Sequence, residues 1–457
     1  YILTDQRAGI DIGYIEAKDI GKSLDDKAYN EQFLRYRKSL PNLILTDYMR
    51  FRLYREGEFV SEVRVAEIKN GRVEAIKGSF DHFRAFIAEF AEHSSQTINT
   101  AAGLSSKMAG KAKLLAQVIE SAVSSDQLTE ENTSLREQME AFRSILIHDI
   151  DPKGFSDLYA QTIAYGMFAA RLHDPSSKTF SRQEAAQLIP QTNPFLRKLF
   201  QYISGYDIDS RIEWIVNALA EVFRATDIAR VLKDFGRSTT KSDPMIHFYE
   251  TFLSEYDPAL RRSRGVWYTP EPVVRFIVSS IDGALKDEFK LPKGLADTSQ
   301  VTINVESQDI NPRTKKRRLE ERRVHKVQIL DPATGTGTFL AEVVKQIYSR
   351  FTGQKGIWSG YVEDHLIPRL NGFELLMASY AVAHLKLDLL LQQTGYKPRN
   401  VGRLHIYLTN SLEEHHPDTG TLFASWLSKE ANEANFIKRD TPVMVVLGNP
   451  PYSRHSM

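Results

Sequence analysis

Cysteine is absent from this chain of 457 residues. Its absence excludes a disulfide framework, a zinc site or iron–sulfur cluster held by thiolates, and a cysteine nucleophile, and it fits a reducing cytoplasm. Long apolar runs are also missing, since no window reaches about 18 uninterrupted apolar residues. The amino-terminal stretch lacks the basic and then apolar layout of a secretion signal. We therefore expect no membrane partner and no export, and we expect a cytoplasmic protein.

An excess of charge of one sign is missing as well, because 59 Lys and Arg residues stand against 58 Asp and Glu residues, for a net charge of +1. Contacts with nucleic acid must then come from local basic clusters. Three clusters could meet phosphates, with solvated loop surfaces as the alternative: Arg35, Arg37 and Lys38; Arg261, Arg262 and Arg264; and Lys315 to Arg318. The chain does contain 42% apolar and 26% charged residues, which is typical of a folded globular protein with roughly two to four domains.

The spacing of apolar residues changes twice along the chain. Residues 1–75 form short strand-like runs, with one helix near 26–39 and a hairpin turn at Glu56-Gly57. Between 76 and 243, apolar residues recur at every third and fourth position, which indicates a structural connector of helices. From 244 to 457, strand, glycine-rich turn and helix alternate, as a parallel doubly wound sheet requires. The predicted fold class is α/β, with a small sheet unit, a helical connector and a Rossmann-like domain.

A glycine-rich turn in the third region, VQILDPATGTGTFLAEVV, predicts a ligand site. An apolar strand ends at Asp331, Gly335 and Gly337 follow, and a helix begins near Thr338, whose free N–H groups can meet a ligand. The turn lacks the third glycine of a dinucleotide-binding fingerprint. Glu374 ends the next strand, where an acidic side chain reaches ribose hydroxyls; the alternative is a glutamate that caps the following helix. Together these residues describe a pocket for a nucleoside with a polar, zwitterionic tail.

The tetrapeptide Asn449-Pro450-Pro451-Tyr452 follows the most apolar strand of the chain. Two consecutive prolines fix the backbone, so that the Asn449 side-chain oxygen and the Pro450 carbonyl can be aimed at one point. These two acceptors could take both hydrogens of a planar exocyclic amine and bias its nitrogen toward a nucleophilic, pyramidal form. Tyr452 would provide a stacking face for a base rotated out of its duplex. The alternative is an ordinary Pro-Pro loop beside a core tyrosine.

Five motifs occur in a fixed order over about 200 residues, from Arg264 to Tyr452. They are RGVWYTPEPVVRFIV, DPATGTGTFL, GFE, TNSL and LGNPPY. This order resembles the adenine-N6 DNA methyltransferases of restriction-modification systems, of the gamma type. The resemblance implies S-adenosylmethionine as cofactor and double-stranded DNA as partner, in a prokaryote. The family continues beyond this point into a target-recognition domain, whereas this sequence has five more residues, so we expect it to be a portion of a longer protein.

The resemblance also assigns cofactor contacts to individual residues. Thr269, in the YTP element, would touch the carboxylate of S-adenosylmethionine. Asp331, Ala333, Gly335 and Gly337 would surround its methionine portion, and Glu374 would hold its ribose. Asn410, at the end of the third strand, would lie near its adenine ring.

The amino-terminal unit carries a second candidate site on the strand GYIEAKD. Glu16 and an upstream carboxylate could share a divalent metal ion that activates water, while Lys18 orients the nucleophile. Gln32 and Tyr36, four positions apart on the next helix, would face the same edge of the sheet. The alternative is surface charge patterning, because E-x-K is common on exposed strands.

These segments, GYIEAKD and EQFLRYRK, resemble the PD-(D/E)XK nuclease units that occur fused to such methyltransferases, as in type IIG and type ISP enzymes. The resemblance implies Mg²⁺ as cofactor, bound by Glu16 and an aspartate that usually follows proline; Asp5 is a substitute here. We therefore predict a restriction-modification enzyme that methylates adenine N6 and cleaves DNA. Alternatives are a methyltransferase acting on protein glutamine or RNA, and an inactive DNA-binding subunit. The chain contains no G-x-x-x-x-G-K-[ST] loop for ATP, and homo-oligomers or further domains stay open.

Overall fold

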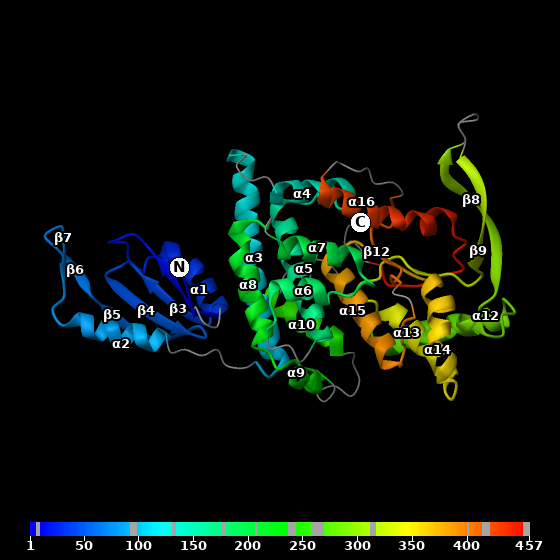
Figure 1. Ribbon diagram of the computed structural model, residues 1–457, viewed down its shortest axis with the longest axis horizontal. Helices are drawn as coiled ribbons and strands as arrows, with labels where there is room; N and C mark the ends of the chain where they lie inside the picture. The colour runs from blue at the N-terminus through cyan, green and yellow to red at the C-terminus, as the bar shows by residue number, and fades with distance from the viewer. Residues whose placement is uncertain are drawn as a thin grey trace, which may run out of the picture.

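The computed structural model describes residues 1–5, 10–91, 98–129, 134–174, 179–205, 208–235, 244–257, 269–310, 317–399, 402–413 and 421–450. Figure 1 shows a sheet with its helices at the amino-terminal end, a layer of helices in the middle, and a second sheet with its helices at the far end. The three regions thus follow one another in space in the order in which they occur in the chain.

The amino-terminal sheet has the strand order β1-β2-β3-β4-β5. Its strands are β1 (Ile2–Asp5), β2 (Ile10–Ala17), β3 (Asn42–Thr46), β4 (Arg50–Arg55) and β5 (Glu58–Arg64). The β2–β3 pair is parallel and the other pairs are antiparallel. A short turn η1 (Lys27–Tyr29) and the helix α1 (Asn30–Ser39) make the crossover between the parallel strands. On one face, Phe86 and Phe90 of α2 (Ser79–Ala91) pack on Ile44 and Leu53.

Two tight turns shape the strands of this unit. Glu56 and Gly57 have φ angles of 49° and 87°, so the expected hairpin turn joins β4 to β5. A second hairpin, β6 (Ala66–Lys69) and β7 (Arg72–Ala75), was not anticipated, although its turn carries a strong signal. Asn70 and Gly71 have φ angles of 48° and 75°, as an Asn-Gly hairpin turn requires.

The middle layer consists of helices, as its spacing predicts. They are α3 (Ala101–Thr129), α4 (Ser134–Ile145), α5 (Pro152–His173), α6 (Arg182–Leu188), α7 (Pro194–Ser204), α8 (Ser210–Arg224), α9 (Ile228–Phe235) and α10 (Pro244–Tyr256). α5 is buried along nearly its whole length. A Cβ at Gly166 would lie 2.1 Å from the Phe200 ring, so α5 and α7 approach closely only because glycine stands there. α10 packs on α3, so this helix, on the carboxyl side of the predicted boundary at residue 243, belongs to the middle layer.

The carboxyl-terminal sheet has the order β12-β11-β10-β13, and all its pairs are parallel. Its strands are β10 (Ile329–Asp331), β11 (Leu370–Glu374), β12 (Ile406–Leu408) and β13 (Val445–Val446). On one face lie α13 (Thr338–Tyr348) and α15 (Met377–Gln393). On the other, Phe373 and Tyr407 pack against Ala434 and Ile437, which follow α16 (Leu422–Glu433) and lie in or beside η6 (Phe436–Asp440). The chain is therefore mixed α/β with a parallel sheet covered on both faces.

Further elements surround this sheet. They are α12 (Glu271–Asp287), η2 (Gly294–Ala296), the strands β8 (Gln300–Ile310) and β9 (Arg317–His325), η3 (Ser349–Phe351), α14 (Lys355–Tyr361), η4 (Val362–Leu366) and η5 (Ile367–Arg369). β8 and β9 form a two-stranded antiparallel ribbon that runs along the far edge of the molecule (Figure 1). Arg317 and Arg318 lie on its second strand, where a loop was the alternative.

Polar contacts join the middle layer to the carboxyl-terminal sheet. The Tyr380 hydroxyl lies 2.9 Å from Asn193 Oδ1 and 2.9 Å from Glu430 Oε1, and Arg403 Nη2 donates to the same glutamate oxygen at 2.7 Å.

Among the helices of the described ranges, none is long and apolar enough to cross a membrane.

Candidate functional site

The glycine-rich turn joins β10 to α13. Gly335 and Gly337 have φ angles of 55° and 78°, in the left-handed region that favours glycine. A Cβ at Gly337 would lie 3.3 Å from Ala383 of α15, which a side chain would crowd. A Cβ at Gly335 would meet nothing nearer than the Ala333 carbonyl oxygen at 4.0 Å. The turn is therefore packed tightly at its helix end and open at Gly335.

Glu374, at the end of β11, connects the neighbouring strand to this turn. Its Oε2 accepts a hydrogen bond of 2.7 Å from the Gly335 N–H. Its Oε1 accepts bonds of 2.8 Å from the N–H groups of Leu375 and Leu376, ahead of α15. The side chain thus makes contacts expected of a capping residue and also holds the glycine turn. A carboxylate offers about four acceptor positions and three are used, so one stays available to a ligand hydroxyl.

Both acidic residues of the turn are buried. Asp331 has no exposed surface; its Oδ1 accepts from the Ala333 N–H at 3.1 Å, and its Oδ2 has no hydrogen-bond partner. Burial raises the pKa of Asp331 to about 8, against the Ala333 hydrogen bond, and the nearby Glu374 charge adds to the rise. Burial likewise raises the pKa of Glu374 to about 7, against its three backbone donors. A buried oxygen without a partner is costly, so this turn is suited to a polar ligand.

The chain leaves β13 through Gly448, Asn449 and Pro450, a segment that we call the Asn449 corner and that lies beside the glycine turn. β13 pairs in parallel with β10, which brings the two strand ends to the same edge of the sheet. At Gly448 a Cβ would lie 2.5 Å from Asp331 Oδ1, so the backbone passes directly against the buried carboxylate. Asn449 Nδ2 donates a 3.0 Å hydrogen bond to Thr269 Oγ1, across 180 positions of sequence. The structure therefore brings together Asn449, Thr269 and Asp331. Pro450 is exposed, and Pro451 and Tyr452 lie outside the described residues.

The loop after β12 closes another side of this edge. Asn410 Nδ2 donates to Glu413 Oε1 at 2.7 Å, and its Oδ1 accepts from the Leu412 N–H at 3.1 Å. Both ends of the amide therefore hold the loop, which differs from the expected contact with a cofactor ring. Ser411 Oγ donates to the Pro332 carbonyl at 2.5 Å and ties this loop to the glycine turn.

Lys438 of η6 stabilises the same loop. Its Nζ donates at 2.7 Å to each of three oxygens, namely Thr409 Oγ1, the Asn410 carbonyl and the Glu413 carbonyl. Sequence reasoning missed Lys438, and it gave no role to Ser411 although this residue lies in the TNSL motif. No motif marks a lysine 28 positions from its partner, because the contact exists only once the sheet has formed.

The residues at this edge fit the nucleoside with a zwitterionic tail that the sequence predicts. Asp331 offers a buried oxygen without a partner, Gly335 leaves open space beside its Cα, and Glu374 keeps one acceptor position. Thr269 and Asn449 close the side toward β13. The site is thus built from four separate segments that meet at the carboxyl ends of parallel strands, where open α/β sheets bind ligands.

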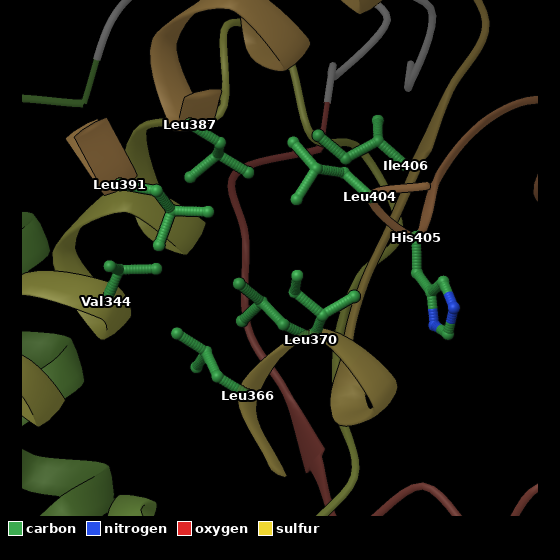
Figure 2. A pocket seen from close by; sticks show the side chains of 9 residues that line it. Val344, Leu366, Leu370, Leu387, Leu391, Leu404, His405 and Ile406 are labelled. Atoms are coloured by element: carbon green, nitrogen blue, oxygen red, sulfur yellow. The ribbon is translucent and has the colours of Figure 1, made fainter. Parts of the chain in front are cut away.

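A cavity elsewhere in this sheet is a packing void. Figure 2 shows apolar side chains of α13, β11 and α15, among them Val344, Leu370, Leu387 and Leu391, around a volume of about 10 Å³. Leu370 and Ile406 begin their strands, so this void lies at the end of the sheet opposite Glu374. A space of this size holds at most one water molecule and no cofactor.

The residues of the second candidate site, in the amino-terminal unit, are also joined by hydrogen bonds. Lys18 Nζ donates to Glu16 Oε1 at 2.8 Å and to Gln32 Oε1 at 3.0 Å. Gln32 Nε2 lies 3.3 Å from the same glutamate oxygen and 3.2 Å from the Tyr36 hydroxyl. The structure therefore brings together all four residues singled out on β2 and α1. Of the basic cluster nearby, Arg37 instead donates to the Gly57 carbonyl and packs on Tyr54, which indicates a structural role.

Asp5 is the last residue of β1, the strand that pairs with β2. The β1–β2 register pairs Asp5 with Ile10, six positions from Glu16 along β2, or roughly 20 Å at about 3.4 Å per residue. Two carboxylates that share one divalent ion must each lie within about 2.6 Å of it. This backbone register gives no support to the Asp5–Glu16 metal pair, which stays a prediction. Among the residues that the structure describes, no cluster of three or more His, Asp or Glu side chains could hold a metal ion.

One of the comparisons with known proteins supports the fold. No protein-family profile matches the chain, and no curated protein matches it. Among solved structures, it is similar to the ATP-dependent type ISP restriction-modification enzyme LlaBIII bound to DNA, at 18% identity and a TM-score of 0.50, over 82% of this chain. It also matches a nuclease-deletion mutant of the type ISP enzyme LlaGI with a DNA substrate mimic (18% identity, TM-score 0.46, 82% of this chain). A third match is the DrdV–DNA complex (21% identity, TM-score 0.45, 99% of this chain).

The chain spans only 38%, 26% and 22% of the DrdV, LlaGI and LlaBIII chains. At 18% identity, the similarity to LlaBIII shows a shared fold and nothing further.

Proposed function

We propose that this chain is the nuclease, connector and methyltransferase portion of a restriction-modification enzyme. Its carboxyl-terminal part would transfer a methyl group from S-adenosylmethionine to adenine N6 in double-stranded DNA. The observation that carries this proposal is the contact of the Asn449 corner with Thr269 and the Asp331 turn. The fold shared with LlaBIII, a restriction-modification enzyme that was solved bound to DNA, supports it.

The Asn449 amide is oriented for the reaction by its own hydrogen bond. Because Nδ2 donates to Thr269, Oδ1 is the atom that accepts a hydrogen from the target amine. With the Pro450 carbonyl as second acceptor, both amino hydrogens are held and the nitrogen lone pair becomes available. An adenine inside a duplex cannot reach this corner, so the base must be flipped out.

The cofactor would be held by the residues of the glycine turn and the strand ends. Glu374 would accept from a ribose hydroxyl, and the open backbone at Gly335 would face the amino-acid portion. S-adenosylmethionine, when bound, supplies an electrophilic methyl group on its sulfonium. The buried Asp331 oxygen would gain a polar partner on binding.

We further propose that the amino-terminal unit cleaves DNA with Mg²⁺. Glu16 would be a ligand of the ion, which activates water and neutralises charge on the phosphate. Lys18, held by Glu16 and Gln32, is poised to orient the attacking water. Glu16 keeps 28% of its side chain exposed, so a phosphate can approach it.

The methylation proposal is tested by incubating the full-length protein with labelled S-adenosylmethionine and, separately, plasmid DNA, total RNA and protein. We expect label in DNA, at least about 100-fold less with Asn449→Ala, and unchanged label with Gln354→Ala, which removes an exposed amide of the same domain. Label only in RNA or protein would replace this proposal with its alternatives. An Asn449→Ala variant that loses nothing would indicate an inactive DNA-binding subunit.

The nuclease proposal is tested by plasmid cleavage in Mg²⁺, with S-adenosylmethionine absent and present. Glu16→Gln and Lys18→Met should each abolish cleavage and leave methylation intact. Glu31→Gln, which changes an exposed glutamate beside Gln32, serves as the control and should cleave as the parent does. Cleavage that survives Glu16→Gln would contradict the assignment.

A further inference from the structure

A cavity of about 330 Å³ adjoins the Glu16 group on the side of the helical connector. Two of its lining residues, Glu16 and Tyr36, belong to the proposed nuclease centre, and Trp214 comes from α8 of the connector. The remaining lining residues are Tyr1, Ile2, Tyr14, Ile15, Leu40 and Leu43. A volume of this size lies in the range of sites for small ligands, about 300–1,000 Å³.

Aromatic rings make up about half of the lining, and the rest is aliphatic apart from a single acidic group. The rings of Tyr14 and Trp214 lie with centroids 6.2 Å apart and planes inclined at 52°. The Lys111 ammonium lies 4.7 Å from the Tyr14 ring centroid, so this ring is also held from α3. Aromatic faces suit a flat heterocycle, and the aliphatic side chains can pack against its edge. The chemistry of the cavity therefore fits a flat, uncharged heterocycle such as a nucleobase better than an anionic ligand.

Close contacts fix the connector against the nuclease-like unit. Ser39 Oγ of α1 donates to the Gly110 carbonyl of α3 at 3.0 Å. A Cβ at Gly110 would lie 3.4 Å from the Lys38 carbonyl oxygen, so the two helices approach closely at a glycine. Lys107 of α3 forms an ion pair with Glu56. α8 packs on α3 and is therefore held in place beside the sheet.

From this placement we propose that the cavity takes a nucleobase next to the scissile phosphate, with Trp214 as the face on which it stacks. The proposal rests on the nuclease function proposed above for Glu16 and Lys18. It makes the cleavage site composite: the sheet supplies the groups that act on the phosphate, and the connector supplies a residue that positions the strand. Trp214 is a positioning residue, since it touches the base and not the reacting atoms.

The test is a double-mutant cycle between Trp214 and the base, using full-length protein. The cleavage position is first mapped, and duplexes are then made with an abasic site on either side of it. Stacking is worth enough that removing the base or the ring should each slow single-turnover cleavage by roughly 10-fold. If the Trp214 ring stacks on the base, then the abasic site should slow cleavage by Trp214→Ala little further than the substitution alone does.

Matched variants and a second activity separate positioning from folding. Trp214→Phe keeps an aromatic face and should retain most of the cleavage rate, whereas Trp214→Leu should behave as Trp214→Ala does. Methylation by all three variants should equal that of the parent, because the other sheet is untouched. Trp426→Phe, in the carboxyl-terminal region, is the control for loss of a tryptophan.

Each outcome decides the question. Independent, multiplicative losses from the abasic site and from Trp214→Ala would overturn the proposal, as would cleavage at the parental rate in Trp214→Ala. Either result would be expected if no nucleobase entered the cavity. A parent protein that cleaves no DNA refutes the nuclease function itself, and the proposal with it.

Discussion

Asp331 is a carboxylate with no exposed surface and one oxygen without a partner, and this makes the glycine turn sensitive to pH. Burial raises its pKa to about 8, well above the value of an exposed aspartate. The folded protein therefore binds a proton on Asp331 more tightly than the unfolded chain does. The stability that this proton confers is complete below about pH 4 and is lost as pH rises toward about 8.

The Asp331→Asn variant should consequently gain stability relative to the parent as pH rises, because asparagine carries no charge to bury. We expect the melting temperature of the variant, minus that of the parent, to increase by at least about 3 °C between about pH 5.5 and pH 8.5 without cofactor. Asp287→Asn, at an exposed position, should show no such trend. A difference that stays flat or falls over this range would contradict the assignment of a buried charge.

At the scale of elements, the loop after β12 depends on one ammonium group from η6. Lys438→Met keeps the aliphatic stem but removes three charge-assisted hydrogen bonds and the contact of the ammonium with the Phe373 ring. A loss of about 2 kcal/mol should lower the melting temperature by roughly 4–8 °C and weaken S-adenosylmethionine binding measured by calorimetry. Lys429→Met, on the exposed side of α16, is the control. Unchanged cofactor affinity in Lys438→Met would separate this loop from the site.

The sequence predicts elements well where a local rule governs them. The strands ending at Asp331 and Glu374, the helix after the YTP element and the Glu56-Gly57 turn all follow from periodicity or turn chemistry. The Asn70-Gly71 hairpin follows the same rule and was overlooked. The β8–β9 ribbon was missed because its strands carry charged residues, and such runs are equally typical of solvated loops.

Contacts between distant segments are beyond sequence reasoning. Nothing local indicates that Asn449 donates a hydrogen bond to Thr269, or that Trp214 and Glu16 line one cavity, because both depend on how the layers pack. The place of Asp5 relative to Glu16 is beyond sequence reasoning for a related reason. Strand register decides which carboxylates meet, and a hairpin with unknown turn geometry does not reveal its register.

At the scale of the whole molecule, a histidine joins the helical connector to the carboxyl-terminal domain. His173 Nε2 lies 2.8 Å from Asp388 Oδ2 of α15, and its Nδ1 lies 2.7 Å from the Ala169 carbonyl. Both partners are acceptors, so both ring nitrogens must carry hydrogen. Burial opposes the charged ring, but these two acceptors outweigh it, and the pKa of His173 is raised.

The contact should therefore stabilise the protein more at low pH. Its contribution is complete below about pH 6.5, the usual value for histidine, and is lost as pH rises through the higher folded pKa. His173→Gln should lower the melting temperature more at about pH 6 than at about pH 9, whereas His82→Gln, at an exposed position, should not. An equal loss at both pH values would show that the ring is neutral and serves only in packing.

The central claim is that the Asn449 corner and the Asp331 turn form one site for methyl transfer to adenine. The most direct measurement is mass spectrometry of nucleosides from DNA incubated with the full-length protein and S-adenosylmethionine carrying a deuterated methyl group. We predict labelled N6-methyladenine with the parent and none above background with Asn449→Ala. Label in cytosine, or equal labelling of adenine by both proteins, would contradict the account.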